Sequence, residues 1–416
     1  MVQSPAFPQP AAKPKIDRNP FAGAQYRWWW AMTFATSLAI GVQLVTVPTY
    51  VLNRTDTPFL VAVAVLCQTV PTALFTLIGG AWADRFGRGV ILRVTLAVTA
   101  ASILALFLLS LADVAALWPV FAVSAVLGTS AAFQNPARQS LINLLAPGSR
   151  LQNGVIWGTL AFMGGQSFLG PTLAGFAVAA FGLTAGFALA VALLAAAIVC
   201  AFRLRGVDGV TPARGSLLTQ IGDGLRYVRG DDRIWQVLVL GAVPGLCYMG
   251  VTQPTFPIFA TETFDQGARG IGLLNGGMGA GVLAGSILLA RWGPRTRRGL
   301  WFLAALPIGG IGFTLAGVAP TFALAVSILI LWGLGAALFI NFASTLLQTY
   351  TAPAYIGRVM SIYSLCVMGA VPLGNLHAGI GLQFTDPRVV IVYSGVVSVI
   401  FGLLALLRLR AVRALD

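Results

Sequence analysis

Residues 80–88 of this 416-residue chain read Gly80-Ala81-Trp82-Ala83-Asp84-Arg85-Phe86-Gly87-Arg88. They directly follow an apolar run from Pro58 to Gly79. A run of this length is enough to cross a lipid bilayer, because a spanning helix needs about 20 mostly apolar residues. The stretch therefore predicts a membrane helix that ends in a short basic loop with one acid, Asp84.

The composition predicts a polytopic membrane protein. Its residues are 57% hydrophobic and only 9% charged, whereas soluble domains carry about 25% charged residues. The net charge of +14 is spread over many short loops and forms no basic domain, which argues against a nucleic-acid partner. The four cysteines lie in apolar runs without C-x-x-C spacing, so we expect no disulfide and no metal site. With no nucleotide-binding motif, we also expect no cofactor and no enzyme activity.

Twelve apolar runs are long enough to span the bilayer and predict an all-α membrane protein with twelve transmembrane helices. They lie at 28–51, 58–82, 89–111, 114–135, 151–180, 183–202, 234–260, 270–290, 299–318, 321–347, 358–384 and 388–407. The implied parts are an N-terminal tail (1–26), a six-helix half (27–202), a linker (203–233), a second six-helix half (234–410) and a C-terminal tail (411–416).

The distribution of basic residues predicts the topology. If both termini are cytoplasmic, 23 of the 26 Lys and Arg residues fall in cytoplasmic segments, as the positive-inside rule requires. The first 25 residues contain no apolar core, so we expect a cytoplasmic tail and not a signal peptide. In the linker, apolar residues at helical spacing predict an amphipathic helix on the inner membrane surface: Leu217, Leu218, Ile221, Leu225 and Val228.

The two halves repeat with a constant offset of 206 residues. This offset relates Gly79, Arg85, Gly87, Phe133 and Asn135 to Gly285, Arg291, Gly293, Phe339 and Asn341. It predicts two six-helix halves in the same orientation, a parallel repeat. The counterpart of Asp84 is Ala290, so only the first half keeps the acid.

Polar residues inside the spans predict which helices face lipid. The interiors of spans 3, 6, 9 and 12 contain no Asn, Gln, His, Asp or Glu, and burial of such groups in lipid is unfavourable. The residues nearest the predicted midplane of the other spans are Gln43, Gln68, Gln166, Tyr248, Asn275, Asn375 and His377. Each amide serves either a hydrogen bond between helices or a cavity. As a set they predict a substrate cavity with polar and apolar walls.

Three further features of the spans are a histidine, a stripe of glycines and a glutamate. His377 is the only histidine; it is either a proton site, because imidazole titrates near neutral pH, or a neutral ring bonded within span 11. Gly277, Gly281 and Gly285 form a stripe of small residues that predicts close helix packing. Glu262, the only glutamate, is expected to be a solvated acid at the outer end of span 7.

Residues 80–88 resemble the signature loop between helices 2 and 3 of the major facilitator superfamily. Gly80, Ala83, Asp84, Arg85, Gly87 and Arg88 match that pattern, whereas Trp82 and Gly89 depart from it. The segment Gly170-Pro171-Thr172-Leu173-Ala174-Gly175 is similar to the G-P-x-x-G-G element of the superfamily's antiporters, with Ala174 in place of one glycine. With Asn135-Pro136-Ala137 after span 4 and Gly357-Arg358-Val359 opening span 11, the chain resembles the branch of enterobactin exporters and macrolide efflux proteins.

The resemblance implies roles for two groups of residues. The loop residues Gly80, Asp84, Arg85, Gly87 and Arg88 would form a latch with Arg138, Gly357 and Arg358 that holds the halves together in the outward-open state. The other interpretation is that the loop acts only as a topology signal. Gly170, Pro171 and Gly175 would form the helix kink that marks exporters, or a packing kink without directional meaning.

The resemblance further implies a secondary active transporter that exports an amphiphilic small molecule, a siderophore or a drug, by alternating access. We expect a monomer in the bacterial inner membrane, with protons as the coupling ion. Span 4 lacks the arginine that many proton-coupled relatives carry, and no span interior holds an acid. The alternatives are an importer or lipid carrier of the same fold and, in another class, a non-transporting receptor or assembly subunit.

Overall fold

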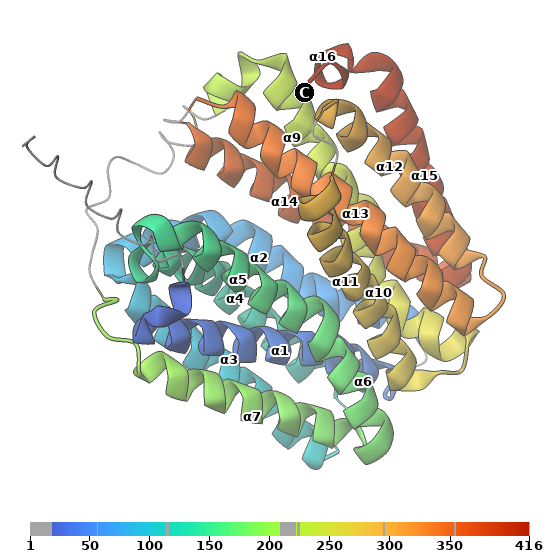
Figure 1. The fold of residues 1–416 in the computed structure, drawn as a ribbon. Coiled ribbons are helices and arrows are strands. Elements are labelled where there is room, and N and C mark those ends of the chain that lie inside the picture. The colour runs from blue at the N-terminus through green and yellow to red at the C-terminus, as the bar shows by residue number, and fades with distance from the viewer. Residues whose placement is uncertain are drawn as a thin grey trace, which may run out of the picture.

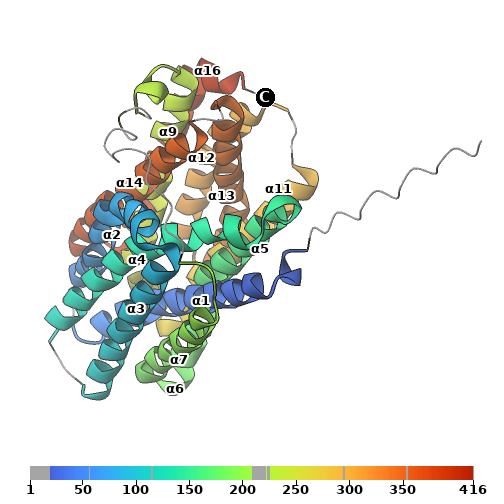
Figure 2. The same cartoon turned by 90° about the vertical axis from the view of Figure 1, so that its left-hand side faces the viewer.

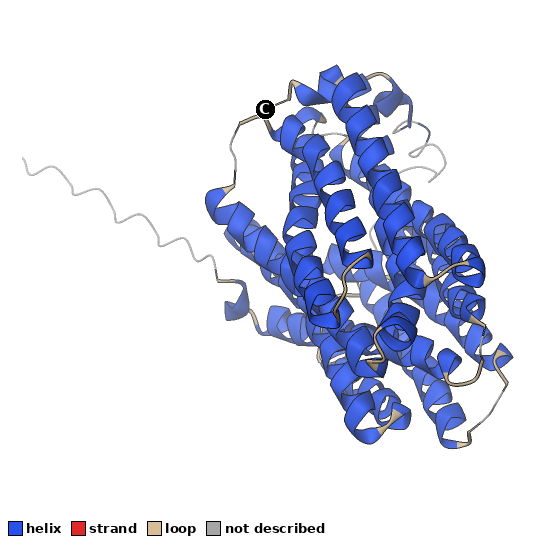
Figure 3. Ribbon diagram, turned by 90° about the vertical axis from the view of Figure 1, so that its right-hand side faces the viewer, coloured by secondary structure: helices blue, strands red, loops and turns tan. Residues whose placement is uncertain are grey.

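The computed structural model describes residues 19–55, 57–113, 116–208, 222, 225–293, 296–352 and 355–415. Every regular element in these ranges is a helix (Figure 3), which confirms the predicted all-α fold. Much of the predicted linker helix, including Leu217, Leu218 and Ile221, lies outside the described residues. Residues 225–229 of the linker are helical.

The first half contains the segments η1 (Pro20–Ala22), α1 (Ala24–Leu52), α2 (Pro58–Phe86), α3 (Arg88–Leu111), α4 (Trp118–Leu145), η2 (Gly148–Arg150), α5 (Leu151–Met163), η3 (Gly164–Leu169), α6 (Gly170–Phe181) and α7 (Leu183–Phe202). The segments α5, η3 and α6 follow one another directly, so they form one continuous helix with a π-helical segment, η3, in its middle. The sequence predicted that span 4 ends at Asn135. Helix α4 instead extends to Leu145, so Asn135 and Arg138 both lie inside it.

The second half contains α9 (Asp232–Pro244), η4 (Gly245–Met249), α10 (Gly250–Ile258), η5 (Phe259–Thr263), α11 (Gly267–Trp292), α12 (Arg298–Gly317), α13 (Phe322–Tyr350), α14 (Ile356–Phe384), α15 (Pro387–Arg408) and α16 (Arg410–Arg413). The segments from α9 to η5 likewise form one continuous helix, which contains the π-helical segments η4 and η5. The C-terminal residues pack on this half, since the Gly299 N–H donates to the Leu415 carbonyl at 3.0 Å.

Ten helices of the described part of the chain are long and apolar enough to cross a membrane. The other two predicted spans, α4 and α5–η3–α6, are helical over comparable lengths. Polar residues in them, such as Gln134 and Asn135 in α4 and Gln166 in η3, lower their mean hydropathy. The structure therefore agrees with the prediction of a polytopic membrane protein, with ten of its twelve spans supported by length and composition.

The two halves form two helical bundles, drawn from blue to green and from yellow to red in Figure 1. In the first bundle α3 packs against α7, and in the second α12 packs against α15. These four helices carry many large apolar side chains that are exposed: Val94, Leu108, Val199, Ile311, Leu315, Ile400 and Leu407. Such a surface suits lipid tails and not water, in agreement with the lipid-facing set predicted from the sequence.

The repeat predicted from the sequence recurs as a repeat of packing. In the first half α2 packs along α4, and in the second half α11 packs along α13. At equivalent positions, Gly79 faces the backbone of Ala132, and Gly285 faces Leu334 and Ala337. Gly277 and Gly281 face α13 in the same way, so the glycine stripe serves close helix packing, as predicted.

The halves meet along two pairs of helices, α2 with α14 and α6 with α11. Figure 2 shows α11 running beside α5 and α6. Gly379 of α14 faces Ala62 of α2, and the Arg269 guanidinium lies 5.3 Å from the Phe176 ring. These contacts lie near the start of α2 and α11 and the end of α6 and α14. The bundles therefore converge on the side of the α1–α2 and α14–α15 connections.

Candidate substrate pocket and signature loop

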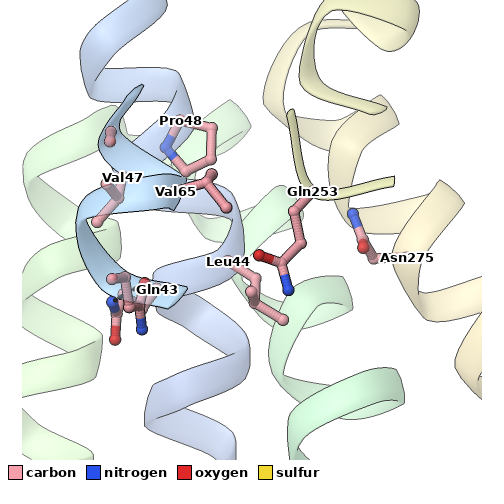
Figure 4. A pocket seen from close by; sticks show the side chains of 9 residues that line it. Gln43, Leu44, Val47, Pro48, Val65, Gln253 and Asn275 are labelled. Atoms are coloured by element: carbon pink, nitrogen blue, oxygen red, sulfur yellow. Dashed lines mark hydrogen bonds between the residues drawn. The ribbon is translucent and has the colours of Figure 1, made fainter. Parts of the chain in front are cut away.

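A small pocket lies between the two halves (Figure 4). It offers about 30 Å³ of space, more than the roughly 10–15 Å³ that a single water molecule needs. Its lining consists of Gln43, Leu44, Val47, Pro48, Ala64, Val65, Gln68, Gln253 and Asn275. Helices α1 and α2 supply the first seven, and α10 and α11 supply the last two. The pocket therefore brings together three of the seven predicted cavity residues, namely Gln43, Gln68 and Asn275.

The carboxamides of the pocket are partly bonded to one another and to their own helices. Gln43 Nε2 donates to Gln68 Oε1 at 3.2 Å, and Asn275 Nδ2 donates to the Ile271 carbonyl at 2.9 Å. A carboxamide has two donors and an acceptor oxygen. Each of these amides thus keeps hydrogen-bonding capacity for a ligand.

Asn375 lies outside the lining of this pocket, in the seam between the halves. Its Nδ2 donates to Thr69 Oγ1 of α2 at 2.9 Å, and the side chain is fully buried. Its Oδ1 has no hydrogen-bond partner in the described part of the chain. Asn375 therefore makes an interhelical bond, one of the two roles that the sequence left open.

Tyr248 points away from the pocket, into the second half. Its hydroxyl lies 2.5 Å from Ser398 Oγ of α15, and its ring packs edge-on against Phe313 and Trp332. Gln166 lies in η3 and is not among the residues that line the pocket.

His377 lines a second pocket of about 270 Å³ within the second half. The other lining residues are Leu246, Cys247, Tyr393, Ser394 and Val397. The ring is held at both nitrogens, with Nε2 3.0 Å from the Leu246 carbonyl and Nδ1 3.0 Å from the Tyr393 hydroxyl. The structure thus separates His377 from the amides of the first pocket, although the sequence placed them at the same depth.

The signature loop, residues 80–88, forms the end of α2 and a one-residue turn. Gly87 alone separates α2 from α3, with φ 90° and ψ 129°. Its α-carbon faces the Asp208 backbone, and a Cβ there would lie 2.8 Å from the Asp208 carbonyl oxygen. Glycine is required on both counts, because it alone tolerates this backbone region without strain and leaves room for the close approach.

The structure describes the side-chain surroundings of only some of the predicted latch residues. Gly80, Asp84 and Gly357 lie in helices, but the surroundings of these three residues are outside the described part of the structure. Arg85 is exposed, and Arg88 Nη1 donates to the Ser140 carbonyl at 3.5 Å. Arg358 lies over the Tyr355 ring at 5.1 Å.

Arg138 is buried within the first half. Its guanidinium lies 4.0 Å from the centre of the Phe162 ring, and its carbonyl accepts a hydrogen bond from Trp29 Nε1 at 3.1 Å. The arrangement is a cation–π contact within the half.

The linker contributes contacts that the sequence did not reveal. Arg93 Nη2 lies 2.5 Å from Asp208 Oδ1, and the Gly89 N–H donates to the Val207 carbonyl at 3.1 Å. At the other end, the Tyr227 ring stacks on Tyr355 at 4.2 Å. One end of the linker is therefore fixed beside the signature loop and the other beside the start of α14. Nothing in the local sequence pattern distinguishes Asp208 from a solvated loop acid.

The Gly170-Pro171 element follows a π-helical turn, η3. Pro171 has no N–H, so the Ser167 carbonyl four residues earlier lacks its usual helical partner. The Gly170 N–H donates to the Gly165 carbonyl, the five-residue spacing of a π-helix. The Ser167 carbonyl lies against Gly279 of α11, and the Pro171 carbonyl lies against Gly272. The kink is thus part of the seam between the halves.

Two helical bundles with apolar outer surfaces, and a pocket of polar and apolar side chains between them, are typical of a membrane transporter. The family model described as Major Facilitator Superfamily matches residues 29–374 and 249–415. The chain belongs to the major facilitator superfamily.

Two curated relatives match most of the chain. Macrolide efflux protein A of Streptococcus pyogenes is 23% identical over 350 residues, which cover 83% of this chain and 86% of the relative. Enterobactin exporter EntS of Citrobacter koseri is 24% identical over 388 residues, which cover 91% of this chain and 90% of the relative. A solved bacterial homologue of the human lysosomal transporter Spinster, in an inward-facing and occupied conformation, superposes with a TM-score of 0.71 at 14% identity and covers 95% of this chain and 97% of its own.

Proposed function

We propose that the protein is a secondary exporter of an amphiphilic small molecule, a siderophore or a drug, that works by alternating access. The observation that carries the proposal is the pocket between the halves, with amides from both halves set among apolar side chains. A site shared by two rigid bundles changes its access when they rock against each other. The direction is supported by two similar proteins, a macrolide efflux protein and an enterobactin exporter.

Accumulation measurements test the proposal. The chain is expressed in a bacterial strain without its own efflux pumps, and the cellular content of a macrolide and of enterobactin is measured. We expect a lower content of at least one compound, and we expect Gln68→Leu to restore it because this substitution removes an amide from the pocket. A higher content would indicate an importer. No change for either compound, with the protein correctly inserted, would contradict export of both substrate types.

We infer that the bundles converge on the external side. The distribution of basic residues predicts that both termini are cytoplasmic, and the contacts between the halves lie on the opposite side, near Phe59, Ala62 and Gly379. This arrangement corresponds to an inward-facing state. The similar solved structure with an inward-facing conformation supports the assignment. Reporter fusions at residues 56, 113 and 386 should read external, and a fusion at residue 209 should read cytoplasmic.

We propose that Asp84 of the signature loop stabilises the opposite, outward-facing state. A carboxylate at the end of α2 would pair with a helix N-terminus and an arginine at the start of α14 when the cytoplasmic ends meet. A partly exposed pair of this kind contributes on the order of 1 kcal/mol. Asp84→Asn should therefore lower flux several-fold while expression and melting temperature stay near those of the parent. Unchanged flux would leave the loop as a topology signal only.

We propose His377 as the proton site that couples transport. Its ring would be bonded in both protonation states, because the Tyr393 hydroxyl lies 3.0 Å from Nδ1 and 3.3 Å from the His377 carbonyl. The hydroxyl donates to Nδ1 when the ring is neutral; when Nδ1 carries a proton, the hydroxyl accepts from it and donates to the carbonyl. The other titratable group around the ring is Cys247 of η4.

The pH profile of flux tests this role. His377→Gln should keep substrate binding and remove the pH dependence of transport, because a carboxamide does not bind or release a proton near neutral pH. Tyr393→Phe is the matched variant: it keeps the imidazole and removes the hydroxyl that bonds both states. A His377→Gln profile identical to that of the parent would reduce His377 to a structural residue.

A further inference from the structure

The pocket between the halves is lined by neutral groups throughout. The residues around it are four carboxamides, three from glutamines and one from an asparagine, and five apolar side chains. Within the described part of the chain, no acidic, basic or histidine side chain belongs to the lining. His377, the only histidine of the chain, faces a different pocket.

Gln253 is the lining residue with the most free hydrogen-bonding capacity. Its carboxamide makes no hydrogen bond to the described part of the chain, whereas those of Gln43 and Asn275 each donate one. Figure 4 shows the side chain of Gln253 extending from α10 between Leu44 of α1 and Asn275 of α11. It therefore lies where a ligand between the halves would sit.

The helix that carries Gln253 is interrupted by a proline one turn further along. Pro257 lies four residues further along α10 and has no N–H, so the Gln253 carbonyl lacks its regular helical partner. The side-chain amide of Gln253 itself offers a ligand one acceptor oxygen and two N–H donors.

The absence of a counter-charge in this lining decides the substrate class. Removal of a charged group from water into such a site costs several kcal/mol unless an opposite charge compensates. A neutral hydroxyl or amide has a much smaller desolvation cost, and hydrogen bonds to the lining offset this cost. We propose that the group seated here is an uncharged head bearing both donors and acceptors, such as a diol or an amide, on an apolar body, and that Gln253 is its specificity-determining residue. This inference rests on the proposed transport function and names the substrate class of the same pocket.

Binding of matched probes tests the proposal. The full chain is placed in lipid nanodiscs, and three fluorescent octyl amphiphiles are used that differ only in the head group: a glycerol diol, a trimethylammonium and a carboxylate. Fluorescence polarisation is measured against empty nanodiscs. We expect the diol to bind at least tenfold more tightly than either charged probe. Gln253→Ala should weaken diol binding about tenfold, Gln253→Glu should shift the preference to the cation, and Gln348→Ala, a control at the far end of α13, should change none of the three.

Two results would overturn the inference. One is equal or tighter binding of a charged probe by the parent chain; the other is diol binding that Gln253→Ala leaves unchanged. Failure here is distinguishable from failure of the export function, which the accumulation assay reports independently. Tight binding of a charged probe together with measurable efflux would remove the neutral-head assignment and keep the exporter. Absence of both binding and efflux would remove both.

Discussion

The two halves share their helix packing but differ at one equivalent turn. In the first half, Gly87 alone joins α2 to α3 with φ 90°; in the second half, α11 ends at Trp292 and α12 begins only at Arg298. The equivalent glycine, Gly293, has φ −62° and ψ 152°, an ordinary extended conformation. The fold therefore requires the repeated packing in both halves, whereas the tight turn belongs to the first half alone, beside the acid and the linker contacts.

Helix α11 shows the same contrast within a single element. One of its faces carries Gly281, which lies against the Ile330 carbonyl of its own half; the other carries Gly279, which lies against the Ser167 carbonyl of the opposite half. Both contacts are too close for a Cβ. The first is a static seam within a bundle, and the second is a seam that must open if the halves rock.

The largest predicted effect comes from substitution on these two faces. Addition of a methyl group to a tight contact costs about 1–3 kcal/mol. Gly279→Ala should disfavour the state closed at this seam and lower flux at least tenfold, with a small change in melting temperature. Gly281→Ala should instead lower the melting temperature of the protein, because its contact lies within the second half. Gly369→Ala, where no atom lies within 4 Å of the added Cβ, is the control. Equal melting losses for Gly279→Ala and Gly281→Ala would break the distinction between the seams.

An effect on stability, without the tenfold loss of flux, is expected at the turn that distinguishes the halves. Gly87→Ala places a side chain in a backbone region that costs about 1–3 kcal/mol and crowds the Asp208 carbonyl. Gly148 is a suitable comparison, because it also has a positive φ (63°) but no atom within 4 Å of an added Cβ. Thermal unfolding should show a larger loss for Gly87→Ala than for Gly148→Ala. Equal losses would mean that the linker contact contributes nothing.

The smallest effect concerns the starts of the two halves. Asp231 caps α9, since its side chain accepts from the Arg233 N–H at 2.9 Å; at the start of α1, Gly23 offers no side-chain cap. Asp231→Ala should lower stability by about 1 kcal/mol. Gly23→Asp should raise stability by a similar or smaller amount, because Gly23 already has an extended conformation. Chemical unfolding at neutral pH measures both, and a loss of stability from Gly23→Asp would contradict the capping argument.

The contribution of Asp231 should also depend on pH. A hydrogen bond from the Arg233 side chain lowers the pKa of the Asp231 carboxyl below its usual value. A lowered folded-state pKa stabilises the protein above the unfolded pKa of about 4, and this stabilisation is lost as the pH falls through the folded value. The stability difference between the parent and Asp231→Ala should thus be constant near neutral pH and shrink only below about pH 4.

Much of the architecture was predictable because it follows from one-dimensional patterns. Span length, the 206-residue offset and the absence of amides from four spans predict the bundle, its repeat and its outer helices. The shared packing face of Gly277, Gly281 and Gly285 was predictable too, since spacing by four residues places them on one side of a helix. The identity of the partner helix, α13, was not predicted.

The composition of the pocket was less predictable, because depth along a span does not determine which way a side chain points. The π-helix η4 includes Tyr248 and adds a residue to its turn, which rotates the following helix face by about 100°. Tyr248 therefore points into the second half while Gln253 reaches the pocket. Likewise, Asp208 acquires its partner only through the fold of the linker.

Pulsed electron spin resonance between the two ends of the molecule tests alternating access most directly. With the four native cysteines replaced, spin labels at Leu144 and Gln348 report the terminal side, and labels at Thr57 and Thr385 report the side where the bundles converge; all four positions are exposed. Addition of a transported substrate should shorten the first distance and lengthen the second in the same sample. Two distances that stay fixed, or that change in the same direction, would contradict a site alternately exposed by rocking halves.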